Sequence, residues 1–126
     1  MNMMKSILLV ATGSALGGVL RFQTSRLSAS LFHGSFPLGT FICNMTGCFI
    51  IGIIYALACR CNWLNADMKL LLAVGFCGGL TTFSSFINEN SQLARTDLPM
   101  TFLYAGGSLL AGFIMLYLGQ QLTKLL

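Results

Sequence analysis

The sequence predicts an all-α integral membrane protein with a single domain, residues 1–126, made of four transmembrane helices. The first observation behind this prediction is the composition, with 56% hydrophobic and only 8% charged residues. Soluble domains carry about 25% charged residues, and a small domain exposes too much of its surface to hide so many apolar side chains. The second observation is that the apolar residues fall into four runs, each long enough to cross a bilayer.

The transmembrane helices are expected at residues 6–31, 38–59, 68–93 and 99–125, separated by the polar segments HGSFP, RCNWLNAD and RTD. Connections this short make neighbouring helices antiparallel. Helices are expected because backbone polar groups in lipid must be satisfied within their own segment. The chain starts like a signal peptide, but its apolar run continues past any cleavage site, so we expect it to stay in place as the first helix.

The third segment contains the unusual stretch GFCGGLTTFSSF, residues 75–86. Glycine weakens a helix because its backbone is unrestrained, and threonine hydroxyls compete for backbone groups. We therefore predict that the third helix is broken near its middle, at about residues 78–82. Carbonyl groups released at such a break can coordinate a small cation. The alternative is a continuous helix whose glycines allow a close contact with another helix.

The distribution of the basic residues hardly favours one orientation in the membrane over the other. The side that holds the termini carries Lys5, Arg60, Lys69 and Lys124, and the other side carries Arg21, Arg26 and Arg95. Orientation normally follows an excess of Lys and Arg on the cytoplasmic side. Either the chain inserts both ways and forms an antiparallel, dual-topology homodimer, or Lys5 and Arg60 fix one orientation. The scattered charges form no patch for nucleic acid.

Small residues recur four positions apart, which allows helix backbones to approach closely. The pairs are Gly13 and Gly17, Gly75 and Gly79, and Ser108 and Gly112. The five cysteines lie mostly in apolar runs, so we interpret them as small buried hydrophobic residues rather than as a disulfide or metal framework.

Polar side chains at membrane depth are costly and are candidates for function. Asn44 lies among apolar residues and must find a partner, which is another helix, water or a substrate. Arg21 lies in the first apolar run and either reaches the interface or lines a wet vestibule. Glu89 is less suited to an anion path and is expected at an outer vestibule, either solvated or paired with a basic residue.

Aromatic and hydroxyl residues follow the predicted break. Phe83 and Phe86 share a helix face and lie next to Ser84, while Tyr104 and Ser108 are four apart on the fourth segment. The edge of an aromatic ring is partly positive. Rings presented edge-on beside hydroxyl and amide donors can therefore solvate an anion without a basic group.

Three stretches, GGVLRF (17–22), GTFICNMTGCFIIG (39–52) and GFCGGLTTFSSF (75–86), together resemble the Fluc (CrcB) family of fluoride channels. The resemblance spans nearly the whole chain, in order and in register. It implies a passive channel, not an enzyme, that exports toxic fluoride across the inner membrane of a prokaryote. It also implies an antiparallel homodimer in the bilayer with two pores and a structural sodium ion at its centre.

The resemblance implies roles for individual residues. Phe83 and Phe86 are similar to the pore phenylalanines, Asn44 to the pore amide donor, and Arg21 to a vestibule arginine that attracts anions. Ser84, Tyr104 and Ser108 would contribute to the polar path, which departs from the family's pattern at Gly112, where the family usually has another hydroxyl. The backbone carbonyls of Gly78 and Thr81 would hold the sodium ion.

Three other functions are compatible with four apolar helices. A small multidrug exporter needs a membrane carboxylate, and Glu89 is the only candidate within a predicted span. A membrane enzyme or metal-binding subunit would have to work with a single histidine, His33, in a linker. An accessory subunit without transport of its own remains the third alternative.

Overall fold

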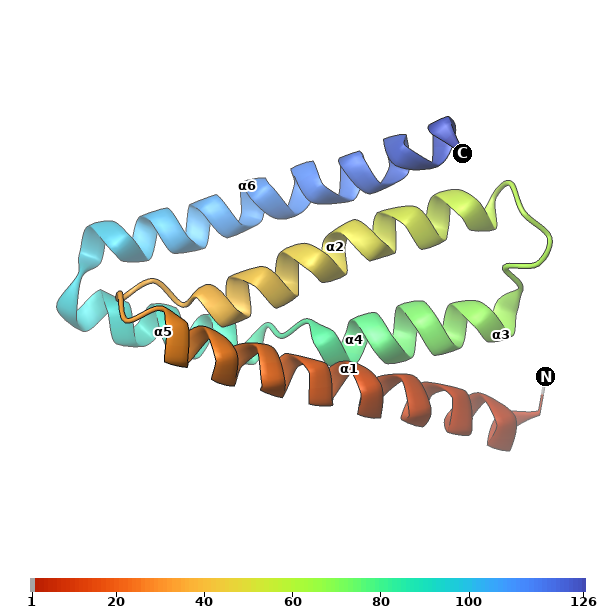
Figure 1. Cartoon of the computed structure of the whole chain (residues 1–126), viewed down its shortest axis with the longest axis horizontal. Coiled ribbons are helices and arrows are strands. Elements are labelled where there is room, and N and C mark those ends of the chain that lie inside the picture. Colours follow the sequence, from red (N-terminus) through yellow and green to blue (C-terminus); the bar gives the residue numbers. More distant parts are fainter. Residues whose placement is uncertain (1) are drawn as a thin grey trace.

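The computed structural model describes residues 2–126, and over this range it consists of helices and their connections, with no strand (Figure 1). Met1 of the predicted domain lies outside the described residues. The elements are α1 (Met3–Leu31), α2 (Leu38–Ala58), α3 (Ala66–Lys69), η1 (Leu70–Cys77), α4 (Gly78–Leu80), α5 (Ser84–Thr96), α6 (Leu98–Leu122) and η2 (Thr123–Leu125).

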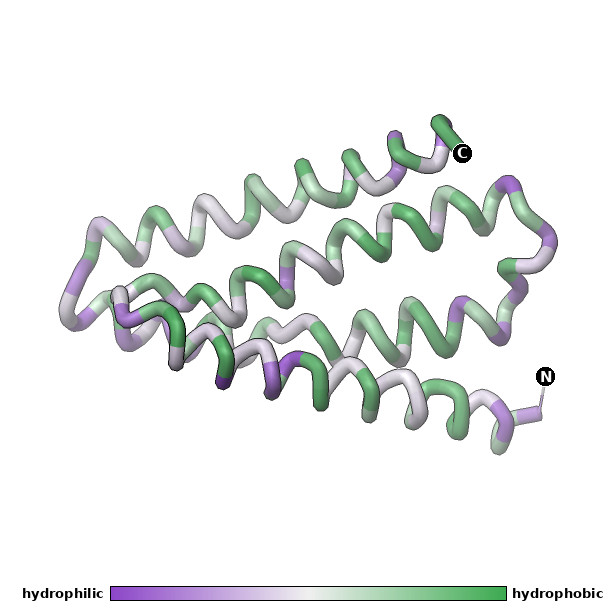
Figure 2. The backbone as a smooth tube through the Cα atoms, viewed as in Figure 1, coloured by the Kyte–Doolittle hydropathy of each residue, from purple (hydrophilic) through white to green (hydrophobic). Residues whose placement is uncertain are grey.

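The prediction of four membrane-spanning helices is confirmed. Four helical segments are long and apolar enough to cross a bilayer: Met3–Leu31, Leu38–Ala58, Ala66–Thr96 and Leu98–Leu125. They agree with the predicted runs to within three residues at each end. Hydrophobic residues predominate along the helices, and hydrophilic residues gather at the connections (Figure 2). Both termini lie at one end of the bundle together with the connection from α2 to α3, as an even number of crossings requires (Figure 1).

Polar side chains begin three of the helices. Asn2 Oδ1 accepts the Met4 N–H at 3.0 Å, Asn65 Oδ1 accepts the Met68 N–H at 3.0 Å, and Asp97 Oδ1 accepts the Met100 N–H at 3.1 Å. Each bond satisfies a backbone donor that the first turn of a helix leaves free.

The helices pack as two pairs, α1 with η1 and α4, and α2 with α6. A Cβ atom on Gly13 would overlap the Leu71 carbonyl oxygen, and one on Gly17 would overlap the Phe76 carbonyl oxygen. The predicted small residues of the first and third spans therefore pack against each other within one chain. The α2–α6 pair depends in the same way on Gly52 and Gly119, which the sequence did not single out.

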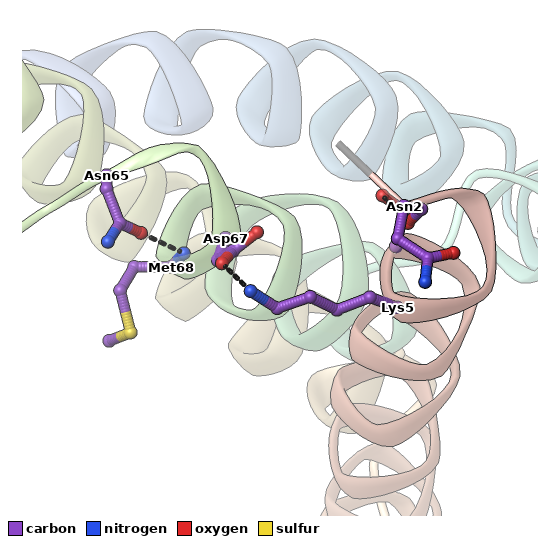
Figure 3. A network of polar contacts seen from close by, with 6 residues as sticks. Asn2, Lys5, Asn65, Asp67 and Met68 are labelled. Atoms are coloured by element: carbon purple, nitrogen blue, oxygen red, sulfur yellow. Dashed lines mark hydrogen bonds and ion pairs between the residues drawn. The ribbon is translucent and has the colours of Figure 1, made fainter.

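Two contacts fasten the end of the bundle that carries the termini. The Lys5 ammonium donates to the Asp67 carboxylate, which joins α1 to α3 (Figure 3). Arg60 Nη1 donates to the Thr123 carbonyl oxygen at 2.7 Å, which joins the end of α2 to the end of α6. Together they use two of the four basic residues counted on this side.

The third span has two irregular regions. Residues Leu70–Cys77 form a π-helix, which the sequence did not predict. The helix then ends at Leu80, Thr81 is extended with φ −88° and ψ 155°, and α5 begins at Ser84. The break predicted at about residues 78–82 is present, and it lies at residues 81–83, at the threonine end of the predicted range. Gly78 keeps a helical φ of −62°, and Gly79 packs closely against Ser14 of α1.

The buried core forms two clusters on either side of this break. Ile54, Leu64, Ala73 and Cys77 pack together toward the termini. Phe86, Leu93 and Tyr104 pack together toward the opposite end. The prediction for the cysteines is confirmed for Cys43 and Cys77, which are buried. It is wrong for Cys59, which is exposed where α2 ends at the surface.

Candidate functional site

A groove of about 440 Å³ lies between α2, α6 and the break in the third span. Its lining includes five residues that the sequence had singled out: Asn44, Thr81, Phe83, Phe86 and Ser108. The structure therefore brings together the predicted amide, both phenylalanines and one predicted hydroxyl from three separate helical segments. Ser84, Tyr104, Arg21 and Gly78 do not line the groove.

Asn44 is bonded to the break through both atoms of its amide. Its Oδ1 accepts the Thr82 N–H at 2.8 Å, and its Nδ2 donates to the Thr82 carbonyl at 3.2 Å. The backbone of Thr82, freed from the helix, is thus satisfied by a side chain 38 residues away. An amide nitrogen carries two hydrogens, so Asn44 keeps one further donor beside the groove.

The hydrogen bonds at the break leave the Gly78 and Thr81 carbonyls free. A continuous helix would use the Thr82 N–H to satisfy the Gly78 carbonyl, but that N–H is bonded to Asn44. The Ser85 N–H would satisfy the Thr81 carbonyl, but it donates instead to Thr82 Oγ1 at 3.2 Å. Within residues 2–126, neither the Gly78 nor the Thr81 carbonyl accepts a hydrogen bond. Carbonyl oxygens are suitable ligands for a hard cation.

The two phenylalanines differ strongly in exposure. Phe83 is 73% exposed, whereas Phe86 is 7% exposed, and their ring centroids are 6.2 Å apart at an interplanar angle of 42°. Phe86 packs against Tyr104 in an edge-on arrangement, with the two ring centroids 5.0 Å apart. Phe86 is therefore fixed by packing, while Phe83 projects from the surface of the single chain.

Tyr104 is fully buried and belongs to a network that the sequence did not predict. Its hydroxyl donates to Glu89 Oε1 at 3.0 Å, and Thr40 Oγ1 donates to Glu89 Oε2 at 2.8 Å. The carboxylate that looked out of place in the sequence is thus satisfied by hydroxyls from α6 and α2. The signal was present as a glutamate within an apolar span, but its partners could be found only from the fold.

Ser108 has a buried hydroxyl without a hydrogen-bond partner among the described residues. Buried hydroxyls are nearly always paired, because an unpaired one costs about 1–3 kcal/mol. Ser84 behaves differently, since it is exposed and its Oγ lies 3.4 Å from Thr82 Oγ1. Of the two predicted hydroxyls on α6, that of Tyr104 is therefore hydrogen-bonded, to Glu89, and that of Ser108 is not.

Arg21 binds the third span at the break. Its Nε donates to the Gly79 carbonyl at 3.0 Å, so the side chain reaches α4 from α1 rather than snorkelling to the interface. The contact satisfies another carbonyl that the end of the helix leaves free.

A second cavity, of about 600 Å³, opens at the end of the bundle opposite the termini. It is lined by the last turns of α1, the connection to α2, and the face of α5 that carries Glu89 and Gln92. His33, the one histidine of the chain, lies at this cavity. Residues 2–126 contain no group of three or more His, Cys, Asp or Glu side chains able to hold a metal ion.

The chain is similar to a known family and to several named proteins. Residues 8–120 match the family model described as CrcB-like protein, Camphor Resistance (CrcB). A protein of Azobacteroides pseudotrichonymphae genomovar. CFP2 named fluoride-specific ion channel FluC is 43% identical over 123 residues, which cover 97% of this chain and 98% of that protein. A protein of Phocaeicola vulgatus with the same name is 42% identical over 125 residues, 96% of this chain and 100% of its own length.

A third protein with this name, from Gloeothece citriformis, is 43% identical over 122 residues, covering 96% of this chain and 98% of that protein. The family model spans all four apolar helices and both sides of the groove. The chain therefore belongs to the CrcB-like family.

Proposed function

We propose that the chain forms a passive channel for fluoride in a cell membrane. The names of its relatives support this proposal. The observation that carries it is the groove, where Asn44, the unpartnered Ser108 hydroxyl and the rings of Phe83 and Phe86 line one space without a basic side chain. A strongly hydrated anion that enters a pore must have its lost water contacts replaced by nearby donors. A channel is not an enzyme, and the groove needs no catalytic group for this task.

Each groove residue then has a defined role. The edges of Phe83 and Phe86 meet the anion, because the rim of an aromatic ring is partly positive. The free N–H of Asn44 and the hydroxyl of Ser108 donate to it. Ser84 extends this path at the surface near Thr82, and Tyr104 supports it by holding Phe86 and Glu89 in place.

Arg21 acts in the proposed channel as the cation that attracts anions into the vestibule. Its Nε is engaged with the Gly79 carbonyl, but a guanidinium has further N–H donors and keeps its charge. The charge lies beside the break, on the α1 side, where it favours anions over cations.

We propose that two copies assemble as an antiparallel homodimer with two pores, inserted in both orientations. The flat count of basic residues supports dual insertion. The exposed ring of Phe83 and the open surroundings of Gly78 provide surface that a second copy can cover. The relatives are bacterial proteins, so the inner membrane of a prokaryote is the expected location.

A structural sodium ion at the dimer centre fits the donors at the break. The carbonyls of Gly78 and Thr81 accept no hydrogen bond within residues 2–126, and Gly78 is exposed. Two carbonyls from each of two copies provide four oxygen ligands, and the bound ion would join the copies and offset the charge of a nearby anion.

The first test is reconstitution of the purified chain into liposomes loaded with fluoride or chloride. An ion-selective electrode records efflux after the membrane potential is short-circuited. We expect fast fluoride efflux, negligible chloride efflux, and a large loss of flux in Phe83→Ile. No fluoride efflux from correctly folded protein would refute the proposal and favour an exporter or accessory subunit.

A further inference from the structure

The groove continues past Ser108 toward the end of the bundle that carries the termini. On this half α2 contributes Cys48 and Ile51, and α6 contributes Gly112 and Leu116. Beyond them the two helices meet closely, since a Cβ atom on Gly52 would overlap the Leu116 carbonyl oxygen. Among these side chains the Cys48 thiol is the one that carries a polar hydrogen.

Gly112 leaves a space directly in front of Cys48. A Cβ atom placed on Gly112 would lie 3.5 Å from Cys48 Sγ and 3.8 Å from Met45 Cε. These are ordinary contact distances, so the space could hold a small side chain and glycine keeps it open. Cys48 is only half-buried, in contrast to Cys43 and Cys77, which are each 1% exposed.

The unpartnered hydroxyl of Ser108 gives this space a polar neighbour. Ser108 is 9% exposed and lies four residues before Gly112, on the same face of α6. Its hydroxyl has no partner within residues 2–126. An unpaired buried donor in a groove indicates that the bound species completes it. The polar wall thus runs from Asn44 to Ser108 and next reaches Cys48.

We propose that Cys48 lines the ion path, where its S–H group, facing the space beside Gly112, continues the polar wall beyond Ser108. The inference rests on the proposed channel function and adds a pore-lining residue to it. A thiol is a weak donor, so its contribution to conduction is small. Chemical modification of this thiol should nevertheless block the path, because any group added to Sγ fills the space that Gly112 leaves.

Water access to Cys48 is tested first, with methyl methanethiosulfonate as the probe. This small reagent reacts with thiolates, which form only where water reaches the sulfur. Protein in liposomes is treated, and each cysteine is then scored by mass spectrometry. We expect Cys48 to be modified together with the exposed Cys59, while Cys43 and Cys77 stay unmodified. An unmodified Cys48 beside a modified Cys59 would overturn the proposal, whether or not the protein conducts.

Fluoride efflux tests the same residue by function. We expect the reagent to abolish flux in the native chain and in Cys59→Ser, but not in Cys48→Ser, which keeps a donor and removes the sulfur. Cys48→Ala should slow flux by about two- to fivefold, the value of one weak hydrogen bond. Block that persists in Cys48→Ser would contradict the proposal.

Gly112→Leu provides an independent variant that leaves the cysteine in place. Its side chain should fill the space, stop fluoride efflux, and protect Cys48 from modification. Size-exclusion chromatography checks that the variant assembles as the native chain does. A folded Gly112→Leu protein with normal flux would show that the ion does not pass this place. Absence of flux in the native chain would refute the channel function instead, and the labelling result would still decide whether the space is wet.

Discussion

Ser108 has a hydroxyl that does nothing for the stability of the single chain. Its Oγ is buried without a partner among the described residues. Replacing an unsatisfied polar group by an apolar one of similar shape is nearly neutral or stabilising. A group kept at a cost to stability is a candidate for work on a ligand.

Ser108→Ala should therefore separate stability from conduction. We expect the free energy of unfolding to stay the same or rise by up to about 1 kcal/mol, while fluoride efflux from liposomes falls. Thermal unfolding in detergent and the efflux assay give the two values. A clear loss of stability would mean that the hydroxyl has a partner in the folded protein, and unchanged flux would remove Ser108 from the path.

Asn44 combines a structural and a conducting role, and two variants distinguish them. Asn44→Ala leaves the Thr82 N–H and carbonyl unpaired, at about 1–3 kcal/mol for each buried group, so both stability and flux should fall. Asn44→Asp keeps an acceptor for the Thr82 N–H but removes the amide donor and adds a negative charge.

We expect Asn44→Asp to retain more thermal stability than Asn44→Ala and to lose fluoride flux nonetheless. Measured side by side, the two variants show whether the amide only holds the break or also meets the anion. Native flux in folded Asn44→Asp would restrict Asn44 to the structural role.

At the scale of the elements, α1 and the third span depend on glycine contacts. A Cβ atom on Gly13 would overlap the Leu71 carbonyl oxygen, whereas one on Gly18 of the same helix meets nothing within 4 Å. Overpacking a tight contact costs about 1–3 kcal/mol. Gly13→Ala should lower the free energy of unfolding by about this amount, and Gly18→Ala should leave it unchanged or raise it by up to about 1 kcal/mol, because alanine favours helix more than glycine. Equal effects of the two substitutions would mean that α1 does not pack on η1 as described.

The break provides a second prediction, for the proposed sodium ion. A ligand that binds the folded assembly stabilises it in a concentration-dependent way. We expect the unfolding temperature of the proposed dimer to rise with sodium and to respond much less to potassium at equal ionic strength, since a site of four carbonyls would favour one ion size. Identical curves in the two salts would argue against an ion site at Gly78 and Thr81.

The elements also show where sequence reasoning reaches its limit. The four spans were predictable because each is a long apolar run, which lipid stabilises without help from other helices. The break was predictable to within a few residues from its glycines and threonines. Its exact position was not, because it depends on Asn44, a partner on another helix that withdraws the Thr82 N–H. The π-helix over Leu70–Cys77 was not predictable either, since its apolar residues are uniform and carry no periodic signal.

For the candidate site, the sequence predicted the groove residues but not the contacts that hold them. The sequence resemblance named Asn44, Phe83, Phe86 and Ser108, and the fold gathers them in one groove. The satisfied state of Glu89 required Tyr104 and Thr40 from two other helices, which no local pattern connects. The contact of Arg21 with the Gly79 carbonyl likewise joins residues 58 positions apart.

At the scale of the whole molecule, insertion in two orientations can be measured directly. The chain is fused at its C-terminus to a reporter active only inside the cell or to one active only outside. We expect comparable signals from both fusions. Asn62→Lys together with Gln121→Lys adds two cations beside the termini and should shift the chain toward termini-inside insertion. Efflux should fall in membranes that hold one orientation alone.

A single active reporter for the native chain would refute the antiparallel dimer. A further control uses a second chain that added cations on the opposite side bias toward the other orientation. Co-expression of the two oppositely biased chains should restore fluoride efflux. If fluoride efflux is not restored although both chains are present and folded, the loss of efflux would come from failed assembly rather than from the orientation of the chains.

The break in the third span is fastened from two sides, by Asn44 of α2 and by Arg21 of α1. It is consequently a fixed joint rather than a hinge, and the Thr82 amide should exchange its hydrogen with solvent slowly despite lying outside any helix. In the proposed channel, motion of this break would therefore not gate the passage. A cell that carries such a channel would limit leakage through how strictly the passage discriminates among ions and how few copies the cell makes.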